Sequence, residues 1–270
     1  MPDPSAVKVK TVATASSSAW RIYRQLQYGP LPALRVVWAE VAAMLFSGLG
    51  GAAGYVLRRL AWRPLLGACG RGVVFGRLVV VRHPSKIRLG DGVIVDDLAV
   101  LDAKGDGNEG IRIGNRAYIG RHSIVYCKNG RIEVGDSVNI ASNCQLFSSH
   151  DLRIGSGTLI GAYSYLMSGG VYEVDVPVPF AEQEGMITRG PLIIGQNCWL
   201  GARVTVLDGA SIGDHSVVGA GAVVTRPLPE ACVAAGVPAR VLRRRTVVPP
   251  AKSDGADRHV SPSAVTEVKR

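Results

Sequence analysis

The sequence predicts an all-β protein, a parallel β-helix of hexapeptide repeats, preceded by a helical segment. Between Leu192 and Val224 an aliphatic residue recurs at every sixth position: Ile194, Leu200, Val206, Ile212, Val218 and Val224. A Gly or Ala often follows it, and 33 glycines in the chain suit a fold with many tight corners. A period of six fits neither a helix nor an ordinary strand, but it fits three short strands that form one triangular coil around an aliphatic interior.

Length and composition restrict the classes of function. A chain of 270 residues with 47% hydrophobic residues can bury one large core in one or two domains. The net charge of +10 would suit nucleic acid or an anionic membrane surface. Aromatic residues are few and no nucleic-acid-binding module is recognisable, so we expect no nucleic-acid partner.

The cysteines argue against a disulfide framework and a zinc site. They are odd in number, scattered and without close pairs: Cys69, Cys127, Cys144, Cys198 and Cys232. We therefore expect reduced thiols in a cytoplasmic protein, and no metal.

The N-terminal quarter divides into two segments. Residues 1–30 begin with a polar stretch that lacks the features of a secretory signal, and we expect them to be disordered or extended. Residues 31–68 read as two short helices joined at residues 47–51, because Glu40 and several glycines interrupt the apolar run. With Arg58, Arg59 and Arg63 placed to meet phosphate head groups, this hairpin could lie on the inner face of the cytoplasmic membrane. The alternative is a helical cap on the open end of the β-helix or between subunits.

Residues 69–225 contain the repeats. Six triplets of aliphatic residues, each spaced by six, begin at positions 89, 113, 134, 154, 194 and 212. The separations between these starts are 24, 21, 20, 40 and 18 residues, so the excess must leave the prism as loops. The longest interruption, residues 170–191, lacks periodicity and is the first candidate for a substrate-covering element. Residues 226–245 form a closing segment, and residues 246–270 are expected to be a disordered tail.

Three features together resemble the hexapeptide-repeat acyltransferases, specifically the sugar O-acetyltransferases that act on galactosides, maltose and polysaccharides. They are the repeat array, the run NCWLGARVTVLDGASIGDHSVVGAGAVVT and the closing AAGVPARVLRR. The resemblance covers roughly residues 70–245 and implies a left-handed β-helix that forms a homotrimer, with active sites between neighbouring prisms. It also implies acetyl-CoA or another acyl-CoA as the donor.

The resemblance implies a donor site in the C-terminal coils. Stacked coils offer rows of backbone amides about 4.8 Å apart along which a pantetheine arm could run. The residues implied are Trp199 as a wall, Gly201, Ala202, Gly219 and Ala220 along the row, Val237 and Pro238 at the nucleotide end, and Arg240 and Arg243 at the phosphates. Corner geometry alone would also explain the small residues, and ordinary packing would explain Trp199.

The catalytic base is where the chain departs from the family. Acyl transfer to a hydroxyl needs a base, and neutral histidine suits this role near pH 7. At the position where the relatives carry their histidine, this chain has Val171. His150, in FSSHD, falls at the equivalent corner one coil earlier, about 5 Å away along the axis, and Asp151 could orient it. We expect His150 to be the base. A surface histidine with no role, or a base from the loop (Tyr172, Glu173 or Asp175), is the alternative.

Three functions compete at this point. The leading one is transfer of an acyl group from CoA to a hydroxyl of a cell-surface glycan or a lipid-linked sugar. The second is a catalytically silent trimer that serves as a scaffold or regulator, which the valine at position 171 would explain. The third, a β-helical carbonic anhydrase, needs three convergent histidines, and no two histidines here lie closer than 28 residues.

Overall fold

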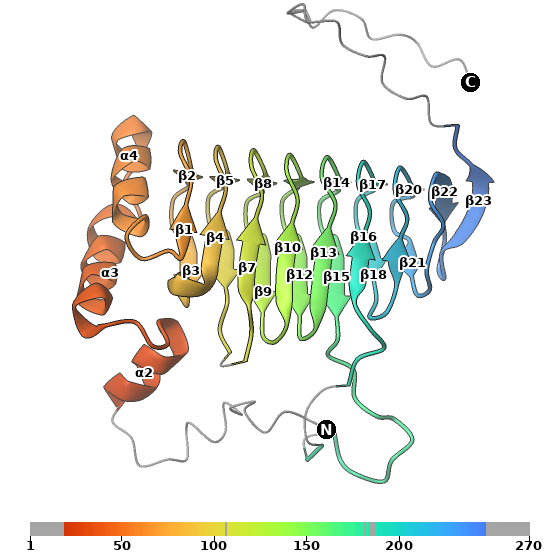
Figure 1. Ribbon diagram of the computed structural model, residues 1–270, viewed down its shortest axis with the longest axis horizontal. Helices are drawn as coiled ribbons and strands as arrows, with labels where there is room; N and C mark the ends of the chain where they lie inside the picture. Colours follow the sequence, from red (N-terminus) through yellow and green to blue (C-terminus); the bar gives the residue numbers. More distant parts are fainter. Residues whose placement is uncertain (1–18, 106, 181, 184–186, 247–270) are drawn as a thin grey trace, which may run out of the picture.

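The computed structural model describes residues 19–105, 107–180, 182–183 and 187–246. Within them the chain forms three helices followed by a prism of seven parallel coils, the left-handed β-helix predicted from the sequence (Figure 1). The helices are α2 (Ala19–Gln27), α3 (Ala33–Phe46) and α4 (Gly51–Trp62), and a short 3-10 turn covers Pro84–Lys86.

Three sheets, named A, B and C in chain order, form the sides of the prism. Sheet A contains β1 (Ala68–Cys69), β4 (Ile87–Leu89), β7 (Gly110–Ile113), β10 (Arg131–Val134), β13 (Asp151–Ile154), β16 (Leu192–Ile194) and β19 (Ser211–Ile212). Sheet B contains β2 (Val74–Phe75), β5 (Ile94–Val95), β8 (Tyr118–Ile119), β11 (Asn139–Ile140), β14 (Leu159–Ile160), β17 (Trp199–Leu200), β20 (Val217–Val218), β22 (Cys232–Ala235) and β23 (Arg240–Arg244). Sheet C contains β3 (Val80–Arg82), β6 (Val100–Asp102), β9 (Ile124–Cys127), β12 (Gln145–Ser148), β15 (Tyr165–Ser168), β18 (Thr205–Val206) and β21 (Val223–Val224).

The interior of the prism is the set of residues that the six-residue period singles out. All eighteen members of the six triplets are at most 4% exposed, and each lies in register with its counterpart one coil away, as Ile140 does with Ile119 and Ile160. One more coil precedes them, with Phe75 and Val81 in the interior. The six-residue pattern did not identify this coil because Cys69 and Phe75 stand where later coils have aliphatic residues.

Close stacking explains the small residues at the corner between sheets B and C, called the B–C corner below. A Cβ on Gly161 would lie 2.5 Å from the amide nitrogen of Ala202, and one on Gly201 would lie 2.6 Å from that of Ala220. Neither contact is tolerable, so the coils can stack at their normal spacing only if these positions are glycine.

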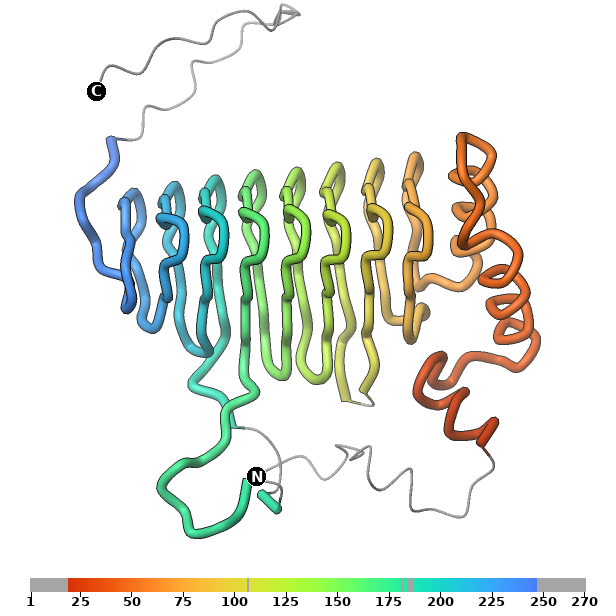
Figure 2. The backbone as a smooth tube through the Cα atoms, turned by 180° about the vertical axis from the view of Figure 1, so that it is seen from behind, coloured from red at the N-terminus to blue at the C-terminus, as the bar shows by residue number. Residues whose placement is uncertain are grey.

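The N-terminal helices cover one end of the prism, and the antiparallel β22–β23 hairpin covers the other (Figure 2). Helix α4 packs on β2, where the buried Arg58 donates from Nε to the carbonyl of Phe75 at 2.8 Å. The expectation that Arg58 meets phosphate head groups was therefore wrong, because its guanidinium is buried against backbone carbonyls. Residues 19–27 form a helix, not the extended segment that the sequence predicted, because α2 packs against β3 and Tyr28 is buried behind it. The predictions for residues 1–18 and 247–270 lie outside the described residues.

None of the helices among the described residues has the length and apolar character needed to cross a membrane.

Candidate functional site

His150 lies at the corner between sheets C and A, called the C–A corner below, between β12 and β13. Its backbone is fixed from both sides. The amide of Arg131 donates to its carbonyl at 3.0 Å, and the amide of the preceding Ser149 donates to Ser168 in the next coil at 2.8 Å. Because Ser148 and Ser168 are in register, the imidazole lies one coil from Gly169 and Gly170, where the long loop begins.

Asp151 does not orient this imidazole. Its carboxylate accepts from Arg131 at 3.1 Å and from Arg153 at 3.0 Å on the outer face of sheet A. Nδ1 of His150 is buried without a hydrogen-bond partner among the described residues. The expectation that Asp151 assists the histidine was therefore wrong, because two arginines on neighbouring strands hold the carboxylate on the other side of the corner.

Both ends of the long loop are attached to one buried residue that the sequence analysis did not identify. Asp208, at the C–A corner of the next coil, accepts from the amides of Gly169 and Arg189 and from the hydroxyl of Thr188, the last at 2.9 Å. A pair of backbone hydrogen bonds between Val171 and Ile187 closes the neck of the loop. The sequence signal that could have identified Asp208 is its place in the run VLDGA, where an acidic residue directly precedes the small residues of a corner.

Beyond this neck the loop exposes apolar side chains. Val174 is 75% exposed and Phe180 is 58% exposed, and the Phe180 ring lies 6.1 Å from that of Tyr172. The described part of the loop extends below the prism in Figure 1. The three alternative bases at positions 172, 173 and 175 are all exposed on this segment.

The B–C corner carries a column of unused amides. The backbone N–H groups of Ala162, Ala202 and Ala220 donate to no acceptor among the described residues. These residues occupy the same place in successive coils, so the amides are separated by the coil spacing of about 4.8 Å. The side chains at these positions are only methyl groups, and Ala202 and Ala220 are exposed. Such a column can hydrogen-bond an extended ligand that runs along the prism.

The expectation for the neighbouring glycines needs a correction. The amide of Gly201 donates to Val218 at 2.8 Å and that of Gly219 to Ala234 at 2.8 Å, so both are used by the ladder between coils. These glycines permit the stacking, and the alanines that follow them supply the unused donors.

The remaining candidates for the donor site lie along the same corner. Trp199 projects from sheet B two residues before Gly201 and is 56% exposed, so ordinary core packing does not explain it. The segment 236–239 continues the column past the last coil. The amide of Val223 donates to the carbonyl of Gly236 at 3.0 Å, and the amide of Ala239 donates to the carbonyl of Val223 at 2.8 Å. The exposed side chain of Val237 and the adjoining Pro238 therefore end the row.

Arg240 and Arg243 lie on β23 at the end of this row. Both are exposed, and neither has a carboxylate within salt-bridge distance among the described residues. Unpaired guanidinium groups at the end of an amide column suit a ligand whose far end carries phosphates.

The structure does not bring His150 and the amide column together within one chain. They occupy opposite edges of sheet C, which is about 15–20 Å wide over the segment from Ala162 to Ser168. The outer face of sheet C between them is lined by half-buried Phe147, Tyr165 and Met167. Burial raises the pKa of Tyr165, so its hydroxyl stays protonated near neutral pH and can donate but not act as a base.

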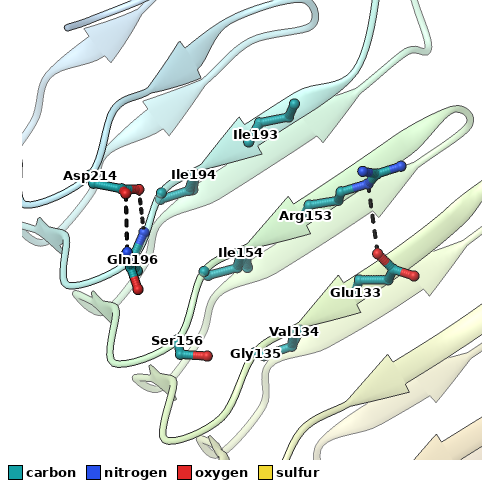
Figure 3. Close-up of a pocket in the computed structure, with 12 residues that line it drawn as sticks. Glu133, Val134, Gly135, Arg153, Ile154, Ser156, Ile193, Ile194, Gln196 and Asp214 are labelled. Carbon is teal, nitrogen blue, oxygen red and sulfur yellow. Dashed lines mark hydrogen bonds and ion pairs between the residues drawn. The ribbon is translucent and has the colours of Figure 1, made fainter. Parts of the chain in front are cut away.

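A shallow groove of about 460 Å³ runs over sheet A and the A–B corner (Figure 3). Glu133 and Arg153, 3.6 Å apart, lie on one side of it. Gln196 and Asp214, joined by two hydrogen bonds of 2.9 and 3.2 Å, lie on the other. The groove contains none of the residues expected at the donor site, and its charged and amide groups suit a polar ligand.

Within the described part of the chain, no three His, Cys, Asp or Glu side chains gather as a metal site would require.

The hexapeptide coils have counterparts in known proteins. The family model for the hexapeptide repeat of succinyl-transferase matches residues 191–226. WcaF of Escherichia coli, named as an acetyltransferase of colanic acid biosynthesis, is 33% identical over 136 residues, which cover 50% of this chain and 70% of WcaF.

Two other relatives are similar. The galactoside O-acetyltransferase of Escherichia coli is 29% identical over 162 residues, covering 60% of this chain and 71% of that protein. A Mycobacterium tuberculosis protein named as an acetyltransferase is 30% identical over 135 residues, which are 50% of this chain and 44% of that protein. The chain belongs to the hexapeptide-repeat acyltransferase family, as the resemblance in its sequence indicated.

Proposed function

We propose that this acyltransferase moves an acyl group, acetyl in the simplest case, from acyl-CoA to a hydroxyl of a sugar. The acceptor would be a cell-surface glycan or its lipid-linked precursor. The observation that carries the donor half of the proposal is the column of amides at Ala162, Ala202 and Ala220, which have no acceptor among the described residues. The column ends beside Arg240 and Arg243, which have no carboxylate partner in that part of the chain.

The pantetheine arm of CoA has amides that match such a column. We place the arm along the B–C corner, with Trp199 as its wall and the adenine ring beside Val237 and Pro238. Arg240 and Arg243 then meet the phosphates, where charge-assisted hydrogen bonds are strongest. This assignment keeps the expected donor residues and assigns the hydrogen bonding to the alanines instead of the glycines.

The proposed reaction has a simple proton balance. His150 accepts the proton of the sugar hydroxyl as the hydroxyl oxygen attacks the thioester carbonyl. The C–O ester bond forms and the C–S bond breaks, and the imidazolium returns the proton to the departing CoA sulfur. A backbone N–H near the carbonyl would stabilise the oxyanion.

A homotrimer would complete the site. Since His150 and the amide column lie at different corners of one prism, a packing that sets the B–C corner of one subunit against the C–A corner of the next would join them. The exposed apolar side chains of the loop, such as Val174 and Phe180, would then be covered by the neighbouring subunit.

A sugar acceptor is supported by the relatives, whose names refer to a galactoside and to colanic acid. The charged ladder of Arg131, Glu133, Asp151 and Arg153 extends from the His150 corner toward the groove on sheet A. Side chains of this kind suit a ligand rich in hydroxyl groups.

The test is the acceptor-dependent release of CoA from acetyl-CoA, measured with galactosides and bacterial exopolysaccharide fragments for the wild type, His150→Ala and the matched control His122→Ala. We expect release by the wild type and the control, and a loss of at least a hundredfold in kcat for His150→Ala, as for removal of a general base. Full activity of His150→Ala would exclude this base. Tight CoA binding with no transfer to any acceptor would favour the scaffold function instead.

A further inference from the structure

The outer face of the N-terminal helices, called the cap face below, is apolar over about three turns of α3 and about two turns of α4. Leu34 and Met44 are each 83% exposed on α3, and their neighbours on both helices are also exposed. The cap face consists of Leu34, Val37, Trp38, Val41, Met44 and Leu45 on α3, with Tyr55, Val56 and Leu60 on α4.

Apart from Trp38, whose indole N–H donates to the carbonyl of Ala61 at 3.0 Å, and Tyr55, whose ring lies 5.1 Å from the Arg58 guanidinium, these side chains make no contact among the described residues that holds the cap. The opposite faces of the helices already do so, through buried Val36 and Ala39 on α3 and through Ala61 and Trp62 on α4. Arg58 fixes α4 by donating to Phe75 in the first coil and to the carbonyls of Phe46 and Leu49 at the end of α3. The exposed apolar residues therefore lie on a surface that the described part of the chain leaves uncovered.

The charge around the cap face has one sign. Residues 19–66 contain six arginines and one acidic residue. That residue, Glu40, accepts from the hydroxyls of Tyr23 at 2.6 Å and Tyr28 at 2.8 Å, on the α2 side of the cap. No salt bridge pairs these arginines within the part of the chain that the structure describes, and Arg21, Arg35 and Arg63 are exposed.

We propose that the cap face docks on a bilayer that contains anionic phospholipids. Apolar side chains would enter the boundary between head groups and acyl chains, and the surrounding arginines would meet lipid phosphates. Helix α3, with 14 residues, is about 21 Å long, whereas the hydrocarbon core is about 30 Å thick, so the helices lie at the interface. A protein partner that matched this face would need a strongly acidic rim, whereas an anionic bilayer supplies negative charge everywhere around it.

Docking would orient the enzyme, and this step rests on the proposed function. The cap stands at the end of the prism in both views, so the prism would rise from the membrane (Figures 1 and 2). The coil of β15, which leads into the loop, is four coils beyond that of β3, or about 19 Å from the capped end. A trimer whose axis is parallel to its prisms would present three cap faces in one plane, which favours a lipid-linked acceptor over a free sugar.

The test is co-sedimentation of the full chain with phosphatidylcholine vesicles, with and without phosphatidylglycerol. The apolar variant is Met44→Glu with Leu60→Glu, and the matched control is Leu242→Glu on β23, which is 66% exposed at the other end of the prism. The charge variant is Arg35→Gln with Arg63→Gln. We expect the wild type to bind the anionic vesicles. The affinity for these vesicles should fall more than tenfold for the apolar variant and about fivefold per arginine for the charge variant. The control should bind as the wild type does.

Equal binding by the apolar variant, or none by the wild type, would overturn the proposal. The wild type could instead associate with itself in the absence of lipid and bind no vesicles. If the apolar variant lost that self-association, the occupant of the cap face would be a second copy of the chain. CoA release with a water-soluble sugar separates the two proposals, because the cap variants should retain it in full even if membrane docking is lost.

Discussion

The carboxylate of Asp208 is a buried group that attaches both ends of a loop of about twenty residues. It accepts from donors at both ends, and at 4% exposure it has little access to water. Asp208→Asn replaces one accepting oxygen with an NH₂ group that faces a backbone N–H, so at least one bond is lost and a repulsive contact is created. We expect faster proteolysis within residues 170–191 and a raised KM for the acceptor. Limited proteolysis and initial-rate kinetics measure the two effects.

Asp214→Asn is the matched control for that change. Asp214 also holds the chain at a corner, by accepting from the amide and side chain of Gln196, but it lies at the A–B corner away from the loop. Its replacement should leave the cleavage rate of the loop unchanged. Equal sensitivity of both variants would mean that Asp208 has no special role in holding the loop.

The carboxylate of Asp97 makes the stability of the fold depend on pH. The backbone N–H of Arg77 lowers the pKa of Asp97, and the guanidinium of the same residue contributes further. Because the pKa is lower in the folded chain, the stabilisation is present above the ordinary carboxyl pKa of about 3.9 and is lost as pH falls through the folded value. We expect Asp97→Asn to lower the urea midpoint at pH 7 but not near pH 2. If the urea midpoint of the variant were below that of the wild type by the same amount at both pH values, this account would be contradicted.

The sequence predicted small residues that lie together at the B–C corner, but it did not predict which of their amides are free to bind a ligand. Small residues at positions 201, 202, 219 and 220 were expected from the resemblance, and all lie along that corner. Which amide is unused depends on the hydrogen bonds between coils, which the six-residue pattern does not specify. The expectation that Asp151 orients the His150 imidazole was wrong for a related reason. Two residues that are adjacent in sequence at a corner place their side chains on different faces of the prism.

At the level of elements, each hexapeptide forms one side of a coil, and its interior residue is the main stabilising contact. Ile140 is fully buried between Ile119 and Ile160 in sheet B. Ile140→Ala should therefore lower the free energy of unfolding by about 2–5 kcal/mol, whereas Asn139→Ala beside it, on the exposed side, should change it by less than about 0.5 kcal/mol. Urea denaturation followed by circular dichroism measures both. Similar losses for the two variants would contradict the inward direction of the repeat residue.

The helical cap depends on one buried arginine in a comparable way. Arg58→Met keeps most of the volume but leaves the carbonyls of Phe46, Leu49 and Phe75 without their donor. We expect faster amide hydrogen exchange across α3 and α4, with no change in the coils beyond β5. Arg63→Met, at an exposed position, is the control. Uniform exchange changes along the whole prism would instead indicate that the cap and coils unfold together.

Element boundaries were predictable where the period is unbroken and less so where it is not. The 40-residue separation between two triplets located the long loop because only one coil can be made from about twenty of those residues. The first coil was missed, since Phe75 fills the interior with one large ring. Helix α2 was missed because its polar residues reveal no buried face until Tyr28 packs behind it.

At the level of the whole molecule, the central claim is that each active site is shared between subunits. The amide column and His150 are at separate corners of a single prism, and no movement within a rigid stack of hydrogen-bonded coils would bring them together. On the assignment that we propose, a functional site requires two chains, one that binds the donor and one that supplies the base.

Subunit complementation tests this claim most directly. His150→Ala removes the base, and Ala202→Trp with Ala220→Trp blocks the amide column, so each variant alone should be inactive. Co-expression of the two in equal amounts should restore about a quarter of the wild-type CoA release, since one interface in four combines an intact column with an intact histidine. Mixed trimers that form but show no more activity than the separate variants would contradict a shared site.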